Sequence, residues 1–173
     1  MCYYLNMVLA THAVVGTIVA TTFTTNPYLA FVIGFVSHFM IDPIPHWDYK
    51  LKSVDRDPTG YINNDVRIDR SFVFDLIKVL FDAFLGTVVS ILIFLFIFKS
   101  SSLIVILAAI TGAILPDPLQ FLYWKTKSKF LFPLQRFHKY IHGRQLKIHP
   151  HLGIALQLLV VTLFLSVSLI IKR

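Results

Sequence analysis

The chain has 173 residues, a length that fits a single domain over residues 1–173. Hydrophobic residues make up 56% of the chain, charged residues only 14%, and the mean hydropathy is +0.71, which excludes an ordinary soluble protein and indicates a polytopic membrane protein. The net charge of +7 therefore favours basic cytoplasmic loops over a nucleic-acid-binding surface, and the single cysteine excludes an internal disulfide or a multi-cysteine zinc site.

Apolar segments along the chain predict an all-α fold, a membrane helical bundle with about five transmembrane helices. We expect these helices at residues 7–24, 28–44, 71–98, 103–122 and 151–171. The second is short for a span, which takes about 17 to 25 residues. The stretches between the second and third helices and between the fourth and fifth are polar or basic, and we expect loops there. Within the later loop, residues 133–142 predict a short helix at the membrane surface.

Five spans would place both long loops on the same side of the membrane as the N-terminus. That side then carries thirteen of the sixteen Lys and Arg residues. Because basic residues mark cytoplasmic loops, we expect an integral protein of the cell's inner membrane with its N-terminus and basic loops in the cytoplasm. Such loops attract anionic lipid headgroups by about 1 kcal/mol per basic residue near the surface.

The densest group of ionisable residues follows the second predicted helix. His38 and Asp42 are four residues apart and therefore share one helix face. Pro43 biases Asp42 away from the helical region, so we expect the helix to end there. His46 and Asp48 follow, which places four potential ligands within eleven residues. The alternative is an imidazole to carboxylate hydrogen bond along the helix, with the later two residues in a loop near the headgroups.

Further ionisable residues are expected near the same membrane face. They are His12, Asp82, Asp117, His138, His142 and His151. An ionisable group in the hydrocarbon layer costs at least about 2.5 kcal/mol, so these side chains should face the bundle interior and find partners. A bound divalent cation satisfies carboxylates and imidazoles together. The sequence therefore predicts one metal site just below the membrane surface.

Each of these residues also has a structural alternative. His12 could hydrogen-bond between helices beside Gly16, and Asp82 could pair with Lys78 one turn earlier. Asp117 could be a helix-end residue. The second pair with i, i+4 spacing, His138 and His142, is typical of helical zinc sites but could be solvated on the interfacial helix.

The motifs THAVVG, GFVSHFMIDPIPH, LPDP and HPHLGIALQLL occur in this order along the chain. In this layout the chain resembles the YdjM-like family of inner-membrane metal-dependent hydrolases, and its second motif is similar to the His-x-x-x-Asp core helix of zinc-dependent phospholipase C. The resemblance implies a metal-binding set made of His12, His38, Asp42, Asp117 and His151.

These observations favour a membrane-bound metal-dependent hydrolase acting on a phosphoester or ester of a lipid or lipid-linked substrate. A mixed His and Asp set suits Zn²⁺, with Mn²⁺ or Fe²⁺ as alternatives. We expect Asp82 to act as a ligand or to orient one, and His46 or His138 to act as general acid or base. The alternative is a non-catalytic membrane protein, either a small metal or proton transporter or a scaffold with polar contacts between helices.

Overall fold

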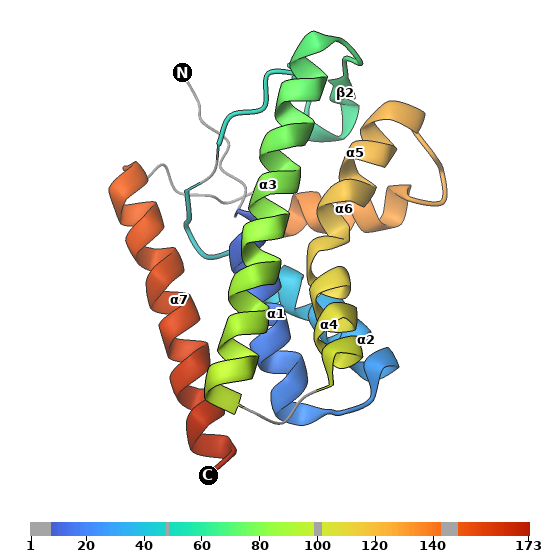
Figure 1. The fold of residues 1–173 in the computed structure, drawn as a ribbon. Helices are drawn as coiled ribbons and strands as arrows, with labels where there is room; N and C mark the ends of the chain where they lie inside the picture. The colour runs from blue at the N-terminus through green and yellow to red at the C-terminus, as the bar shows by residue number, and fades with distance from the viewer. Residues whose placement is uncertain (1–7, 48, 99–101, 143–148) are drawn as a thin grey trace.

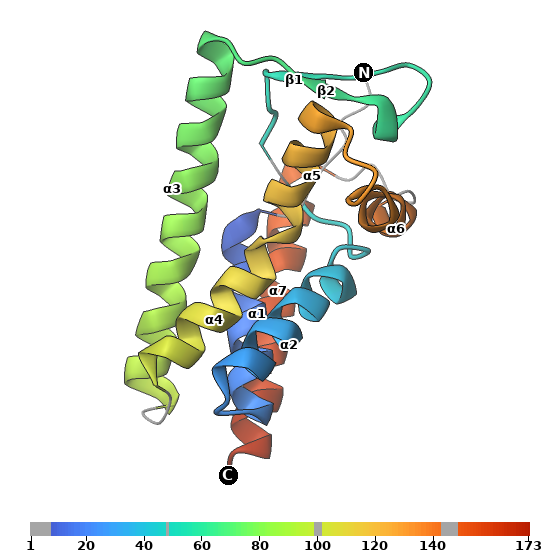
Figure 2. The same cartoon turned by 90° about the vertical axis from the view of Figure 1, so that its right-hand side faces the viewer.

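The computed structural model describes residues 8–47, 49–98, 102–142 and 149–173, and this part of the chain is predominantly α-helical (Figures 1 and 2). Its helices are α1 Leu9–Phe23, α2 Pro27–Ile41, α3 Arg70–Ile93, α4 Leu103–Ile114, α5 Pro116–Thr126, α6 Phe132–His142 and α7 Pro150–Ile171. A π-helical turn, Phe94–Phe98, continues α3. The expected all-α class is confirmed, and α6 begins within one residue of its predicted start.

The expectation of five transmembrane helices is not supported. Within the part of the chain that the structure describes, two helices are long and apolar enough to span a membrane, namely α3 with its π-helical end, at 29 residues, and α7, at 22. The α4 and α5 pair, bent by 41°, makes a third if it counts as one span. By contrast, α1 and α2 have 15 residues each and rise only about 22 Å, less than the roughly 30 Å of a hydrocarbon core.

The outer faces of α3 and α7 carry large apolar side chains that the other described residues leave exposed. Phe81 and Phe84 on α3 are 65% and 64% exposed, and Ile170 on α7 is 71% exposed. A contiguous apolar surface of this kind marks a membrane or protein contact. The two helices therefore make a membrane location possible.

Helix α1 is apolar for a different reason, because it is the centre of the bundle. It contacts α2, α3, α4 and α7, and eleven of its residues are buried (Figure 1). Hydropathy cannot separate a helix enclosed by other helices from one enclosed by lipid. This explains why the sequence predicts more spans than the structure contains.

Helices α2 and α4 cross at a point where each contributes a glycine. A Cβ atom on Gly34 would collide with the backbone carbonyl of Ala109, and a Cβ on Gly112 would collide with that of Phe31. Small residues permit such close backbone approach between apolar helices. The crossing brings the C-terminal end of α2 beside the C-terminal end of α4 (Figure 2).

The chain bends between α4 and α5, and this bend changes the expected position of Asp117. We expected one helix over residues 103–122, with Asp117 as a possible helix-end residue, but the helix breaks after Ile114 and Asp117 lies in the first turn of α5, which continues to Thr126. Pro116 and Pro118 flank it without breaking α5, because N–H groups in the first turn of a helix have no partner within the helix.

At the C-terminal end of α2, one expectation is met and another is not. The helix ends at Ile41, as predicted from Pro43. However, Asp42 keeps right-handed helical backbone angles, with φ −52° and ψ −36°, and its N–H bonds to the His38 carbonyl at 3.1 Å. The helical geometry continues far enough for Asp42 to remain on the His38 face.

The first long loop folds over the end of α5. Strands β1 Val54–Asp55 and β2 Asp65–Val66 pair antiparallel, and the 3₁₀ turn Tyr61–Asn63 lies between them. Val66 packs in one apolar cluster with Tyr123 and Trp124. The loop therefore covers the end of the bundle where α5 and α6 lie (Figure 2).

Candidate metal centre

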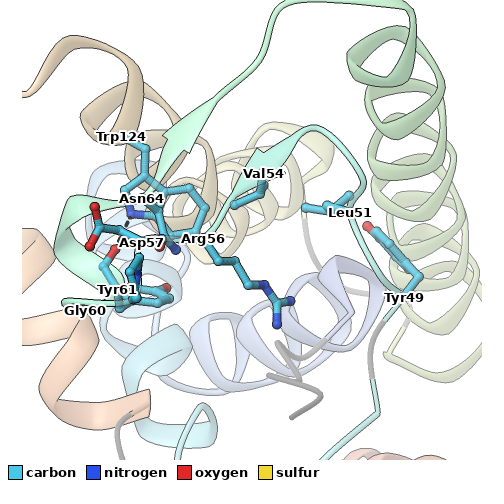
Figure 3. Close-up of a pocket in the computed structure, with 10 residues that line it drawn as sticks. Tyr49, Leu51, Val54, Arg56, Asp57, Gly60, Tyr61, Asn64 and Trp124 are labelled. Atoms are coloured by element: carbon cyan, nitrogen blue, oxygen red, sulfur yellow. Dashed lines mark hydrogen bonds between the residues drawn. The ribbon is translucent and has the colours of Figure 1, made fainter. Parts of the chain in front are cut away.

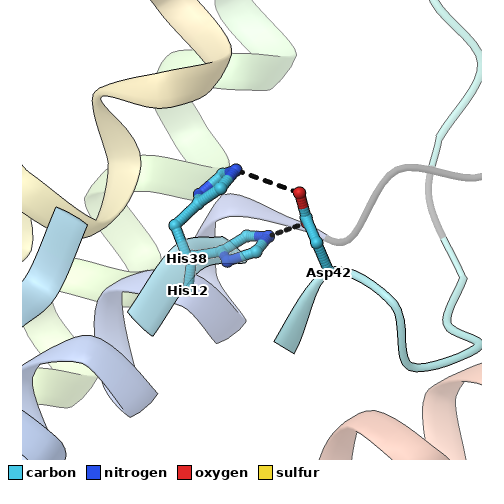
Figure 4. A group of neighbouring side chains, drawn as sticks. All are labelled: His12, His38 and Asp42. Carbon is cyan, nitrogen blue, oxygen red and sulfur yellow. Dashed lines mark ion pairs between the residues drawn. The ribbon is translucent and has the colours of Figure 1, made fainter. Parts of the chain in front are cut away.

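Five buried ionisable side chains converge near the start of α1. They are His12 from α1, His38 from α2, Asp42 at the end of α2, Asp117 from α5 and His138 from α6. Their exposed fractions range from 0% to 8%. Figure 4 shows one ring nitrogen of His12 and one of His38, Nε2 in each case, pointing toward the carboxylate of Asp42.

Asp42 is the centre of this cluster. Its Oδ1 lies 3.2 Å from Nε2 of His12. Its Oδ2 lies 3.3 Å from Nε2 of His38 and 3.0 Å from Nε2 of His138. The rings of His12 and His38 are stacked, with centroids 3.9 Å apart. One carboxylate therefore faces three imidazoles that come from three different helices.

Asp117 closes the other side of the cluster. Its Oδ1 lies 3.6 Å from Nε2 of His38 and 3.8 Å from Nε2 of His138, and the two imidazole nitrogens are 3.4 Å apart. In a tetrahedral site with metal–ligand bonds of about 2.0 to 2.1 Å, ligand atoms are about 3.3 Å apart. The separations across the whole cluster, 3.0 to 3.8 Å with those of Asp42 included, bracket that value, so these donor atoms could hold a small divalent ion.

The cluster contains two overlapping groups of three residues that could hold a metal ion. One is His12, His38 and Asp42, and the other is His38, Asp117 and His138. All members are buried, and His38 belongs to both groups. Nitrogen and carboxylate donors together are typical of Zn²⁺, Mn²⁺ and Fe²⁺ sites. The residues present therefore fit a divalent metal.

A backbone carbonyl of α4 determines which ring nitrogen of His38 carries a proton. Nδ1 lies 2.8 Å from the carbonyl oxygen of Ala113, which can only accept a hydrogen bond. Nδ1 therefore carries a proton, and Nε2 faces Asp42, Asp117 and His138. Metal-binding histidines commonly have such a carbonyl partner. The Ala113 contact depends on the close crossing of α2 and α4, which sequence analysis did not detect.

Gln120 is the partner of Nδ1 of His138, as the Ala113 carbonyl is the partner of Nδ1 of His38. Its side-chain nitrogen lies 3.3 Å from Nδ1 of His138 and also contacts the hydroxyl of Tyr61, while its Oε1 is buried without a hydrogen bond in the part of the chain that the structure describes. The oxygen and nitrogen of an amide are equivalent in shape. With the amide turned over, Oε1 accepts from both neighbours and leaves Nε2 of His138 as a donor to metal.

The tyrosine in this chain of contacts remains protonated. Burial raises the pKa of the Tyr61 hydroxyl well above its usual value, and the negative charges of Asp117 and Asp42 raise it further. Tyr61 can therefore donate a hydrogen bond to Oε1 of Gln120 when the amide is turned over, whereas in the structure the Gln120 nitrogen donates to the Tyr61 hydroxyl. Sequence analysis identified neither residue, although Gln120 follows Asp117 by three positions and so lies on the same face of α5.

Asp82 is not a member of either metal-binding group. Its carboxylate accepts hydrogen bonds from the backbone N–H groups of Leu9 and Ala10, and the Tyr49 hydroxyl lies 3.4 Å from Oδ2. Asp82 thus holds the first turn of α1, which carries His12. The alternative pairing with Lys78 is not formed, because Nζ of Lys78 lies 2.9 Å from Asp75.

The remaining predicted residues lie apart from both groups or outside the described chain. His46 is buried in the turn after α2, with Nδ1 2.5 Å from the carbonyl of Ile44. His151 is exposed in the first turn of α7. Asp48 and the side chain of His142 lie outside the described part of the structure.

Fold and site together define an all-helical protein with candidate membrane-spanning helices and a buried cluster of three histidines and two aspartates. Comparison of the chain with protein-family models, curated proteins and solved structures finds no match. Membership of the YdjM-like family therefore stays a prediction, based on the motifs alone.

Proposed function

We propose that this protein is a membrane-bound metal-dependent hydrolase that acts on a phosphoester or ester of a lipid or lipid-linked substrate. The single observation that carries the proposal is the convergence of His38, Asp42 and His138, whose donor atoms lie 3.0 to 3.4 Å apart although they come from α2 and α6. Burying such groups is costly unless they are paired or bind a cation, and a divalent ion satisfies all of them together.

Zn²⁺ fits this donor set best, with Mn²⁺ or Fe²⁺ as alternatives. A bound divalent ion would supply Lewis acidity to a scissile ester and lower the pKa of water toward neutrality. We assign His12, His38, Asp42, Asp117 and His138 as ligands. His138 is better assigned as a ligand than as a general base, because Nε2 faces Asp42 and Nδ1 faces Gln120.

His46 remains the candidate for general acid or base. Its Nδ1 is bound to the Ile44 carbonyl, so Nε2 is the nitrogen that would accept or donate a proton. Because the basic loops lie at the end of the bundle nearest the cluster, we place this end at the cytoplasmic face of the inner membrane, where anionic lipid headgroups are available.

Metal content and hydrolysis, measured on the same preparations, test this proposal. We expect purified protein in detergent to retain stoichiometric divalent metal and to hydrolyse a fluorogenic phosphoester. His38→Ala should lower both by about tenfold or more, whereas His151→Ala, an exposed histidine outside the cluster, should leave both unchanged. Wild-type protein that binds no divalent metal after metal loading would contradict the proposal.

One observation favours a second candidate, a non-catalytic scaffold. Asp42 lies within ion-pair distance of three histidines, so a protonated imidazole would satisfy the carboxylate without metal. In a scaffold, Asp117→Asn should lower thermal stability without any change in metal content. In the hydrolase, the same variant should lose metal affinity.

A further inference from the structure

A second concave site lies on the loop side of the cluster. It is a pocket of about 310 Å³ lined by nine residues of the loop between Tyr49 and Asn64 and by Trp124 of α5 (Figure 3). This volume is at the lower end of the range of about 300 to 1,000 Å³ for small-molecule sites. It suits a compact polar headgroup rather than an acyl chain.

The pocket wall combines a cation with rigid aromatic rings. Figure 3 shows the guanidinium of Arg56 extending between Tyr61 on one side and Leu51 on the other. The Tyr61 and Trp124 rings meet edge to face at 5.0 Å, and the indole N–H of Trp124 donates to the Tyr61 carbonyl at 3.0 Å. These contacts fix the aromatic wall in place.

The charge around the pocket is predominantly positive. Lys127 donates to the Asn64 carbonyl, and Nζ of Lys139 lies beside Gly60, so two ammonium groups accompany Arg56 at the rim. The one carboxylate among the described lining residues is Asp57. Hydrogen bonds from the Thr59 hydroxyl and N–H hold the pKa of Asp57 below its usual value, so it remains an ionised acceptor.

Tyr61 connects this pocket to the metal centre. Its ring lines the pocket, and its hydroxyl contacts Gln120, which in turn contacts His138. A molecule in the pocket therefore lies one side chain away from the residues that orient a metal ligand.

We propose that this pocket binds a phosphate ester carrying a small polyol, the headgroup of the substrate. Arg56 would contact the phosphate through its planar pair of N–H donors. Asp57 and Asn64 would accept and donate hydrogen bonds to the polyol hydroxyl groups, and Trp124 would pack against its carbon face. The headgroup's role in hydrolysis rests on the proposed function, but its binding does not, because the pocket contains none of the proposed metal ligands.

Binding can therefore be measured on the metal-free protein. We would titrate glycerol phosphate into EDTA-treated protein in neutral detergent by calorimetry, and repeat the titration with inorganic phosphate and with nanodiscs that contain phosphatidylglycerol. Arg56→Gln removes the guanidinium at an exposed position, so folding should be preserved. Lys52→Gln makes the same charge change at an exposed position of the same loop outside the pocket.

We expect saturable binding that Arg56→Gln weakens by roughly ten- to a hundredfold and Lys52→Gln leaves within about twofold. Saturation by glycerol phosphate supports a free phosphate ester as the source of the headgroup, and saturation by nanodiscs alone supports a lipid. Equal weakening by both variants, inorganic phosphate binding as tightly as glycerol phosphate, or the absence of saturation would each overturn the proposal. If the wild-type protein binds the headgroup but hydrolyses no phosphoester, this result contradicts the proposed function and leaves the headgroup site standing.

Discussion

Nε2 of His138 lies 3.0 Å from Oδ2 of Asp42, although 96 residues separate them in the chain. This contact joins the short helix α6 to the end of α2 in the interior of the protein. The buried face of α6 thus carries Gln135 and His138, while Phe137 is half exposed. The helix that we expected at the membrane surface therefore has a polar inner side, and His138 on that side is a member of the candidate metal centre.

Replacing Asp42 should affect metal binding more than any other single change in the cluster. Asp42→Asn removes the carboxylate that faces three imidazoles, so we expect Zn²⁺ affinity to fall by about a hundredfold or more. Competition with a fluorescent zinc chelator measures this. Asp55→Asn, at an exposed loop position, is the control and should bind Zn²⁺ like the wild type. Equal affinity in all three proteins would exclude Asp42 as a ligand.

Gln120 should act on the metal only through His138. Gln120→Leu removes the partner of Nδ1 at constant burial, and we expect Zn²⁺ affinity to fall by about ten- to a hundredfold. Gln120→Glu keeps an acceptor facing Nδ1 and should restore most of the affinity. If leucine and glutamate variants bind Zn²⁺ equally, the amide does not orient His138.

The glycine crossing of α2 and α4 should be intolerant of side chains. Gly112→Ala places a methyl group against the backbone of Phe31, so we expect a loss of about 1 to 3 kcal/mol in the free energy of unfolding. Denaturation in detergent, followed by circular dichroism, measures the loss. The neighbouring exposed residue provides the control, since Thr111→Ala should change stability by less than about 1 kcal/mol.

The proposed orientation can be tested with single cysteines. In a Cys2→Ser background, Thr59→Cys in the loop and Arg173→Cys at the end of α7 are both exposed positions near opposite ends of the bundle. We expect a membrane-impermeant maleimide to label residue 173 in intact cells and residue 59 only in inside-out vesicles. Labelling of both positions from the same side would contradict the three spans, namely α3, the α4 and α5 pair, and α7, that this orientation requires.

Local spacing and the cost of burying charge placed His12, His38, Asp42 and Asp117 among the candidates, and the structure brings these four together. The same reasoning also proposed Asp82 and His151, which are in neither group. The spacing of His38 and Asp42 on one helix is a property of local geometry. The position of His138 is not a property of local geometry, because it depends on how the chain folds back after α5 and places α6. Sequence analysis identified His138 as a general acid or base, or as the i, i+4 partner of His142, but it did not predict the contact with Asp42.

The number of spans was overestimated for a physical reason. A window of apolar residues measures hydrophobicity, and both α1 in the bundle centre and α7 at its surface satisfy that measure. Helix length distinguishes a buried helix from a spanning one. A polar turn separates α1 from α2, and a proline follows the end of α2. Similarly, Ala113 and Gln120 carry no charge, so a search for ionisable residues did not select them, although Gln120 lies three positions after Asp117.

The bend before Pro116 determines the angular setting of Asp117. Five positions separate Gly112, which is fixed against α2, from Asp117, which faces the cluster. Inserting a single residue between them would rotate the carboxylate by about 100° and shift it by about 1.5 Å, away from both histidines. This short segment should therefore have the least tolerance for changes in length anywhere in the described chain.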